Sequence, residues 1–267
     1  MENNLALKKT IEYMKKHWPS EVKEEWQVKI EDYPAILKKV MQDFTVNKSQ
    51  KRHFVRIAGL SGSGKTTQLL PAAEAYFEKQ NLAPVLVAAR RFVEYHPHYL
   101  EILDFYGESQ LRKMTDEFST IMMFLTLNAL TEAQYDILLD VTLLDPEIEK
   151  ILIGMLSKNN YEMLMLMVAV APEVTEKHLS GRGWRHSRET ELEFMRVTDA
   201  ALEFYAEECP DMRIVLWNVF DSQPVYDGAT KNVLEDFRKY SSLTDIPEHD
   251  ESLIREAKIR YLTTDLN

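Results

Sequence analysis

The sequence predicts an α/β protein: a doubly wound, mainly parallel sheet of about five strands, with helical N- and C-terminal extensions. From residue 53 onward, short apolar runs rich in β-forming residues alternate with longer helical stretches. This alternation is typical of a parallel sheet whose two faces are covered by helices. A second observation agrees with it, because a glycine-rich turn joins the first apolar run to the first helix.

Each predicted strand is an apolar run between helical stretches. The five runs are residues 54–58, 85–89, 136–141, 163–171 and 212–219. Helices are expected to begin near Lys65, Gly107, Pro146 and Arg188. The fourth run, MLMLMVAVA, is apolar throughout, which fits a strand buried on both faces, although a short buried helix has the same signature.

Helical periodicity on both sides of the sheet region predicts three parts. Residues 1–52 form an N-terminal helical extension, in which apolar residues recur among lysines. Residues 53–227 form the α/β domain, and residues 228–267 form a C-terminal helical extension. The pattern of the first part is typical of a helical cap with a solvated charged face.

Composition limits the class of protein. The 267 residues are 45% hydrophobic with a formal net charge of −11, so the chain can bury a core but lacks a broad basic surface for nucleic acid or anionic membranes. The one cysteine, Cys209, excludes a disulfide framework and favours a reducing compartment. No segment has the ~18 apolar residues needed to span a bilayer. We therefore expect a cytoplasmic protein with no nucleic-acid or membrane partner.

The sharpest feature is GLSGSGKT at 59–66, which satisfies the phosphate-loop (P-loop) pattern G-x-x-x-x-G-K-[ST]. Backbone N–H groups of such a loop surround a polyphosphate at a helix N-terminus. Lys65 would contact the β- and γ-phosphates, and the hydroxyl of Thr66 would ligate Mg²⁺. The residues expected to bind ATP, or GTP, are Gly59, Leu60, Ser61, Gly62, Ser63, Gly64, Lys65, Thr66 and Thr67.

Three arginines, Arg182, Arg185 and Arg188, follow the fourth predicted strand. Guanidinium groups form bidentate contacts with the phosphate oxygens that carry charge during phosphoryl transfer. A small kinase lid would use arginines in this way, so the domain has a P-loop kinase-like pattern; an ordinary basic turn before a helix is the alternative. The N-K-x-D motif typical of GTPases is absent from the sequence.

Taken in order, these motifs resemble the zeta toxin family, the P-loop kinases of toxin–antitoxin systems. GLSGSGKTT matches the phosphate loop, Phe92 with HPHY matches the segment F-x-x-x-HP-x-[YF], and ILLDVT resembles the apolar strand that ends in E-G-T. Arg182 and Arg185 resemble the two phosphate-directed arginines of the family. The resemblance covers residues 53–220 or thereabouts.

The resemblance implies ATP-dependent phosphorylation of a hydroxyl of UDP-N-acetylglucosamine or a related nucleotide. On the matching positions, the expected catalytic residues are Lys65, Arg182, Arg185 and Asp140. The expected substrate-binding residues are Arg90, Glu94, His96, Asp140 and Thr142. Because helical antitoxins inhibit the family, an antitoxin in trans, or residues 1–50 acting in cis, is an expected partner.

One position departs from the family pattern. The family has an Asp six residues before the HP pair that accepts the hydroxyl proton, and Arg90 stands there in this chain. An arginine stays protonated and cannot act as a base. Asp140 is the first candidate to replace the missing base, and Glu94 is the second. The alternative is a catalytically silent nucleotide-binding or regulatory protein. The arginine is then either natural divergence or a substitution that silences the enzyme. Loss of a general base removes about 10²- to 10⁴-fold in rate and leaves ATP binding intact.

His96 and His98 form an H-x-H pair around Pro97. Two histidines make an incomplete metal site, and the sequence offers no obvious third ligand. We therefore expect these side chains to pack in the substrate loop or to cap a helix rather than to bind a metal.

Overall fold

The computed structural model describes residues 11–12, 14–16, 20–180, 188–244 and 250–264. The chain divides into two compact units, and each of them is discontinuous in sequence. The first contains Met1–Gln50 and Val85–Tyr135, and the second contains Lys51–Pro84 and Asp136–Asn267. The three continuous domains expected from the sequence stay a prediction.

The second unit contains five strands that lie side by side in the order β3-β1-β4-β5-β6. They are β1 (His53–Ala58), β3 (Ile137–Asp140), β4 (Glu162–Ala169), β5 (Arg213–Asn218) and β6 (Tyr226–Ala229). β1 pairs in parallel with β3 and β4, β4 pairs in parallel with β5, and β6 is antiparallel to β5. The mainly parallel sheet is confirmed, and the MLMLMVAVA run is a strand rather than a helix.

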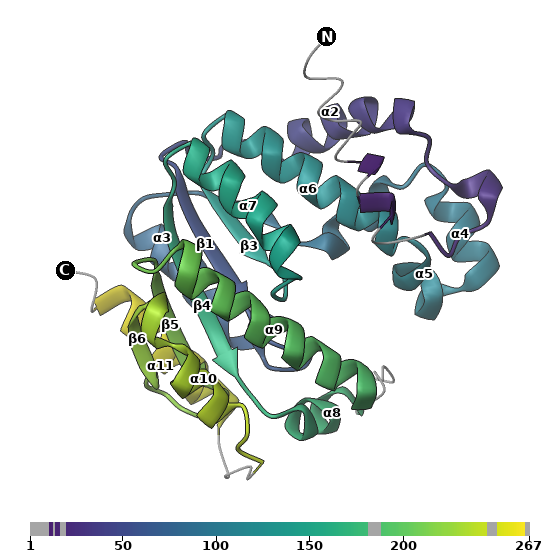
Figure 1. The fold of residues 1–267 in the computed structure, drawn as a ribbon. Coiled ribbons are helices and arrows are strands. Elements are labelled where there is room, and N and C mark those ends of the chain that lie inside the picture. The colour runs from purple at the N-terminus through teal and green to yellow at the C-terminus, as the bar shows by residue number, and fades with distance from the viewer. Residues whose placement is uncertain (1–10, 13, 17–19, 181–187, 245–249, 265–267) are drawn as a thin grey trace. The chain divides into compact units, whose positions relative to one another are not determined.

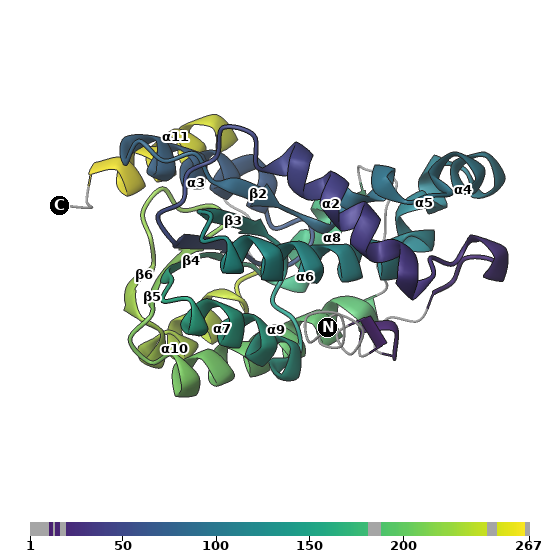
Figure 2. The ribbon, with the colours of Figure 1, turned by 90° about the horizontal axis from the view of Figure 1, so that it is seen from above.

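Helices cover both faces of this sheet, which explains why its central strands are apolar along their whole length. α3 and α11 lie on one face, and α7, α9 and α10 lie on the other (Figure 1, Figure 2). The helical elements of this unit are η3 (Lys65–Leu69), α3 (Leu70–Lys79), α7 (Pro146–Lys158), α8 (Pro172–Ser180), α9 (Arg188–Glu208), η5 (Thr230–Asn232), α10 (Leu234–Tyr240) and α11 (Glu251–Thr264). Among the described residues, no helix has the length and hydrophobicity that a membrane crossing requires.

A buried ion pair joins the central strand to one helical layer. Arg56 of β1 is 1% exposed and donates hydrogen bonds to both carboxylate oxygens of Glu149 on α7. Tyr205 of α9 accepts a third hydrogen bond from Arg56 at 3.0 Å and donates to Glu149 at 2.8 Å. Burial alone would lower the pKa of Arg56, but Glu149 and Tyr205 raise it overall, so the guanidinium stays charged.

The first unit is mainly helical. Its elements are η1 (Glu24–Trp26), η2 (Ile30–Asp32), α2 (Tyr33–Phe44), β2 (Val85–Val87), η4 (Ala89–Tyr95), α4 (Tyr99–Tyr106), α5 (Glu108–Met114) and α6 (Asp116–Glu132). Tyr33 of α2 packs on Phe118 of α6, and Phe44 of α2 packs on Phe92, with ring centroids 6.0 and 5.4 Å apart. The described part of the predicted N-terminal extension therefore shares one core with the segment that follows β2.

We predict that Glu149→Ala lowers the free energy of unfolding by about 3–5 kcal/mol, because it leaves the buried charge of Arg56 without its counter-ion. Urea unfolding followed by tryptophan fluorescence measures the loss. Glu193→Ala is the matched control, since Glu193 pairs with Arg196 on the exposed surface of α9 and surface pairs contribute little. Equal effects of the two substitutions would contradict the prediction.

Candidate functional site

The glycine-rich segment forms a tight loop between β1 and η3. Gly64, the residue before the helical turn, has a φ of +85°, a left-handed conformation that glycine adopts without strain. Gly59 has no room for a side chain, because a Cβ there would lie 2.9 Å from Ser63 Oγ and 3.0 Å from the carbonyl oxygen of Val168. A loop of this form at the start of a helix is suited to bind an anion.

Lys65 begins the helical turn and folds back into the loop. Its Nζ donates hydrogen bonds to the carbonyl oxygens of Gly59 at 2.6 Å and Leu60 at 2.7 Å. The turn itself is a π-helix, in which the N–H of Leu70 donates to the carbonyl of Lys65. Pro71 follows in the first turn of α3, where a residue without an N–H donor is tolerated.

Two predicted site residues from different elements lie together at the carboxyl end of the sheet. Parallel pairing sets Ile57 of β1 opposite Asp140 of β3, so Asp140 ends its strand beside the start of the P-loop. The hydroxyl of Thr66 donates a long hydrogen bond of 3.5 Å to Asp140 Oδ2, and Asp140 is 6% exposed. A hydroxyl and a carboxylate are the oxygen donors that Mg²⁺ prefers.

These two groups would not complete a metal site alone. The described residues contain no group of three or more His, Cys, Asp or Glu side chains that could hold a metal ion. Mg²⁺ commonly keeps several waters and takes one or two protein ligands together with phosphate oxygens. Thr66 and Asp140 therefore fit an ion that arrives with a polyphosphate.

The segment after Asp140 carries Thr142, and the buried ion pair fixes its backbone. Arg56 donates a hydrogen bond of 2.8 Å to the carbonyl of Thr142. Glu149 accepts a hydrogen bond of 2.6 Å from the N–H of Leu144. The interaction that ties β1 to α7 thus also determines the path of the chain beside the candidate site.

Arg90, Glu94 and His96, which the sequence assigns to substrate binding, belong to the first unit. Arg90 and Glu94 lie on η4 and are exposed, whereas His96 is 4% exposed. The ring of His96 packs edge-on against Phe118 with centroids 4.7 Å apart, and its Nδ1 accepts a hydrogen bond of 3.1 Å from the N–H of His98. A ring nitrogen that accepts an N–H is unprotonated, so His96 is a neutral core residue, in agreement with the packing interpretation.

Arg182 and Arg185 lie outside the described residues, so their predicted roles stay predictions. Arg188 begins α9, as expected for a helix start, and pairs on the surface with Glu173 of α8 at 2.9 Å. This surface ion pair is a structural contact, of the kind expected if the arginines form an ordinary basic turn before a helix.

Glu191 on α9 is a candidate site residue that sequence reasoning missed. It is 2% exposed, its Oε2 accepts a hydrogen bond of 3.4 Å from Thr175, and its Oε1 has no hydrogen-bond partner among the described residues. Burial raises the pKa of Glu191, and the positive charge of Lys65 is among the effects that oppose the rise. No local signal could have found it, because a glutamate in a helix normally faces solvent.

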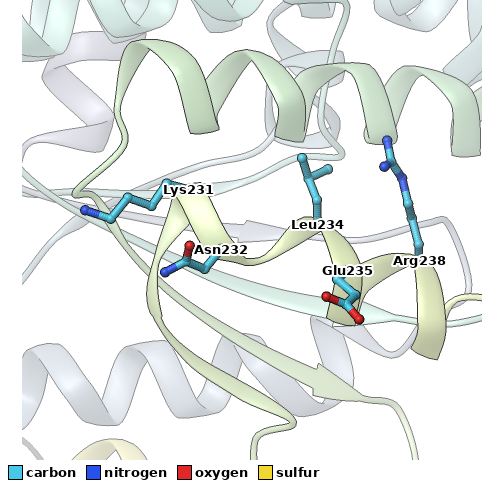
Figure 3. Close-up of a pocket in the computed structure, with 5 residues that line it drawn as sticks. All are labelled: Lys231, Asn232, Leu234, Glu235 and Arg238. Atoms are coloured by element: carbon cyan, nitrogen blue, oxygen red, sulfur yellow. The ribbon is translucent and has the colours of Figure 1, made fainter.

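Two surface hollows in the described part of the second unit lie near the amino ends of the strands, away from the P-loop. One hollow of about 550 Å³ lies between η5 and α10 and is lined by Lys231, Asn232, Leu234, Glu235 and Arg238 (Figure 3). Its two basic residues are engaged elsewhere: Arg238 pairs with Asp199 and Glu203 of α9, and Lys231 pairs with Asp211. A second hollow of about 300 Å³ lies beside Arg213, where β5 begins.

The parallel sheet with a P-loop at the carboxyl end of a central strand defines an α/β protein with a P-loop kinase-like fold. Residues 38–228 match the family model described as Zeta toxin. Because this match spans most of the chain, the chain belongs to the zeta toxin family. Membership supports a kinase-like, nucleotide-binding function.

Two relatives agree with this assignment. Toxin PezT of Streptococcus pneumoniae serotype 4 is 28% identical over 121 residues, which are 45% of this chain and 46% of that protein. The aligned region thus spans about half the length of the curated relative. A solved structure from work on the PezAT chromosomal toxin–antitoxin system of Streptococcus pneumoniae covers 90% of this chain and 99% of its own, with a TM-score of 0.66 at 19% identity. The fold predicted from the sequence is confirmed.

We predict that His96 makes the protein less stable in acid. Burial lowers the pKa of His96 to about 4, with the charge of His98 adding to the effect, whereas an unfolded histidine titrates near 6.5. Between these values the unfolded chain binds more protons, so stability is lost as the pH falls, by at most about 1.4 kcal/mol per unit.

Urea midpoints at pH 7.5, 6.0 and 5.0 measure this loss for the wild type and for His96→Asn. The variant removes the titrating ring and keeps a polar side chain, so its stability should fall less steeply over the same range. Parallel pH profiles for the two proteins would show that His96 does not contribute.

Proposed function

We propose that this chain is a small-molecule kinase that uses ATP, or GTP, and Mg²⁺ to phosphorylate a hydroxyl of a nucleotide sugar or a related nucleotide. The observation that carries the proposal is the contact of Thr66 with Asp140 beside Lys65, because it brings a lysine, a hydroxyl and a carboxylate together at a P-loop. UDP-N-acetylglucosamine is the acceptor that the sequence resemblance implies.

Each site residue has a proposed task. Lys65 would exchange its two backbone carbonyl partners for β- and γ-phosphate oxygens when a nucleotide binds. Thr66 and Asp140 would hold Mg²⁺, which neutralises charge on the phosphates when bound. Arg182 and Arg185 would contact the transferred phosphoryl group, where a planar guanidinium can form two hydrogen bonds.

The general base must be a residue other than Arg90, because an arginine cannot accept a proton. Asp140 and Glu94 are the candidates from the sequence, and the buried carboxylate of Glu191 adds a third. Asp140 as a metal ligand would share its oxygen lone pairs with the ion, which makes it a weaker base. Burial raises the pKa of Glu191, and a carboxylate with a raised pKa is a stronger base.

A second candidate function is nucleotide binding without transfer. The observation that favours it is Arg90, which stands at the family's base position and is exposed on η4. Such a protein would bind ATP through the same P-loop and Lys65 but would turn over no acceptor. The two functions differ in product formation and not in nucleotide affinity.

We also propose a helical antitoxin as a partner in trans and a cytoplasmic location. Inhibition in cis by residues 1–50 is a separate proposal. Tyr33 and Phe44 of this segment are 1% and 5% exposed in the core of the first unit, so a packing role already accounts for its amphipathic pattern.

The kinase proposal predicts a phosphorylated product when the protein is incubated with ATP, Mg²⁺ and a panel of nucleotide sugars, nucleotides and dinucleotides. Mass spectrometry detects the product, and Lys65→Ala is the inactive control.

Product from the wild type would establish a kinase and name its acceptor. Product only from Arg90→Asp would mean a kinase silenced at one residue, with a gain on the order of 10²- to 10⁴-fold from the restored base. Product from neither protein would contradict the kinase proposal for these acceptors and favour nucleotide binding alone.

The metal assignment predicts that Asp140→Asn weakens binding of Mg²⁺–ATP about tenfold, or roughly 1.4 kcal/mol, because an amide is a poor substitute for a carboxylate ligand. Binding of ATP in EDTA should stay the same or improve, since the substitution removes a negative charge near the phosphates. Isothermal titration calorimetry measures both affinities. Equal losses with and without Mg²⁺ would contradict the assignment.

A further inference from the structure

α11 lies outside the part of the chain that matches the family model, which ends at residue 228. Asp250 precedes the helix and accepts a hydrogen bond of 2.9 Å from the N–H of Ser252, which caps the first turn. α11 packs along α3 (Figure 2), and it also contacts η3. A C-terminal helix beyond the family match therefore contacts the helical turn that carries the P-loop lysine.

The buried face of α11 contains a lysine where an apolar residue is expected. Ile254, Lys258 and Leu262 follow one another at four-residue spacing, and Lys258 is 0% exposed. Lysine is almost never fully buried unless its amine has a specific partner. The partner here is an amide, that of Gln68 in η3, and the bond between them is 2.6 Å long.

Gln68 connects this lysine to the P-loop. A protonated lysine has only donors, so the amide oxygen of Gln68 faces Lys258 and the amide nitrogen faces the other way. That nitrogen lies on the side of Gly64, because a Cβ built at Gly64 would be 3.3 Å from it. The backbone N–H of Gln68 also donates to the carbonyl of Gly64 at 2.8 Å. One side chain thus separates Lys258 from the last glycine of the loop.

The surroundings of Lys258 make its charge responsive to a bound anion. Its Nζ lies 5.9 Å from the ring centroid of Trp217 on β5, and among the described residues the negative charge of Asp221 acts on it. Burial lowers the pKa of Lys258 to about 7, and Asp221 opposes that shift. A further negative charge nearby would favour the protonated form, and a polyphosphate on the P-loop supplies that charge.

We propose that α11 is part of the nucleotide site and that Lys258 is a positioning residue, which acts through Gln68 to hold the P-loop and places a buried positive charge behind it. This inference rests on the proposed nucleotide binding and extends it to a residue and a helix that the P-loop motif does not include. A lysine kept only for packing would be replaceable by an apolar side chain of similar length without loss of affinity.

The test compares Lys258→Met with Arg255→Met, which removes the same charge from the exposed face of the same helix. Calorimetry gives the dissociation constant of Mg²⁺–ATP for each protein at pH 6.5 and 9.0, and urea unfolding gives its stability. We expect Lys258→Met to bind about tenfold more weakly at pH 6.5. The weakening should shrink at pH 9.0, where the wild-type lysine is neutral; ratios of dissociation constants cancel the titration of ATP itself.

Lys258→Met by itself leaves the buried amide of Gln68 without its lysine partner. A double variant, Lys258→Met with Gln68→Leu, replaces both polar partners by apolar side chains and so avoids this cost. The Gln68→Leu single variant is measured beside it. If Lys258 acts through Gln68, the double variant should bind no more weakly than the weaker of Lys258→Met and Gln68→Leu, since effects on one shared contact are not additive.

The outcomes separate this inference from the proposed function. A wild-type protein that does not bind Mg²⁺–ATP would overturn both. A wild type that binds, with Lys258→Met binding as tightly as Arg255→Met, would overturn only the role of Lys258. A loss of affinity in Lys258→Met that is independent of pH and accompanied by an equal loss of stability would also overturn it, since that result describes a packing residue.

Discussion

The position of β1 between two parallel neighbours is the constraint on which the candidate site depends. Because β3 and β4 both run in its direction, the carboxyl ends of all three strands reach the same edge of the sheet. The P-loop leaves β1 at that edge, and Asp140 ends β3 beside it. An antiparallel neighbour would have placed the carboxylate at the opposite edge, away from Thr66.

Arg56 makes this constraint stronger. It lies in the middle of β1 and reaches α7, α9 and the segment after Asp140 through one buried network. A buried charge is costly unless it is paired, and here Glu149 supplies the pair. The same ion pair therefore holds the strand that ends in the P-loop and the segment that carries Thr142. A change that moves one of these segments should also move the other.

Three further charged groups of the second unit are buried or half-buried around the P-loop helix. Lys65 donates hydrogen bonds to the loop carbonyls, and its charge acts on Glu191. Lys258 on α11 donates a hydrogen bond to Gln68. In a low-dielectric environment such groups respond strongly to an added anion. The chain carries a net charge of −11, so an anionic ligand depends on this local arrangement rather than on the charge of the whole protein.

The sequence by itself determined the features that are local along the chain. The P-loop was predicted from GLSGSGKT because its glycines, lysine and threonine lie in one short segment, and the strands between residues 54 and 219 were predicted because each is a short apolar run between helical stretches. β6 was not predicted, because YDGA is short and half polar. The sequence assigned Asp140 to catalysis and substrate binding, but its contact with Thr66 follows from the parallel pairing of β1 with β3.

Only the tertiary structure decided which distant residues meet. Arg56 and Glu149 are 93 residues apart, and Gln68 and Lys258 are 190 residues apart, and in sequence each of the four looks like an ordinary charged or polar residue. Glu191 has the pattern of a solvent-facing helix residue and is buried. Local patterns report what a segment prefers, whereas burial and pairing of polar groups depend on which segments pack together, and that information is spread over the whole chain.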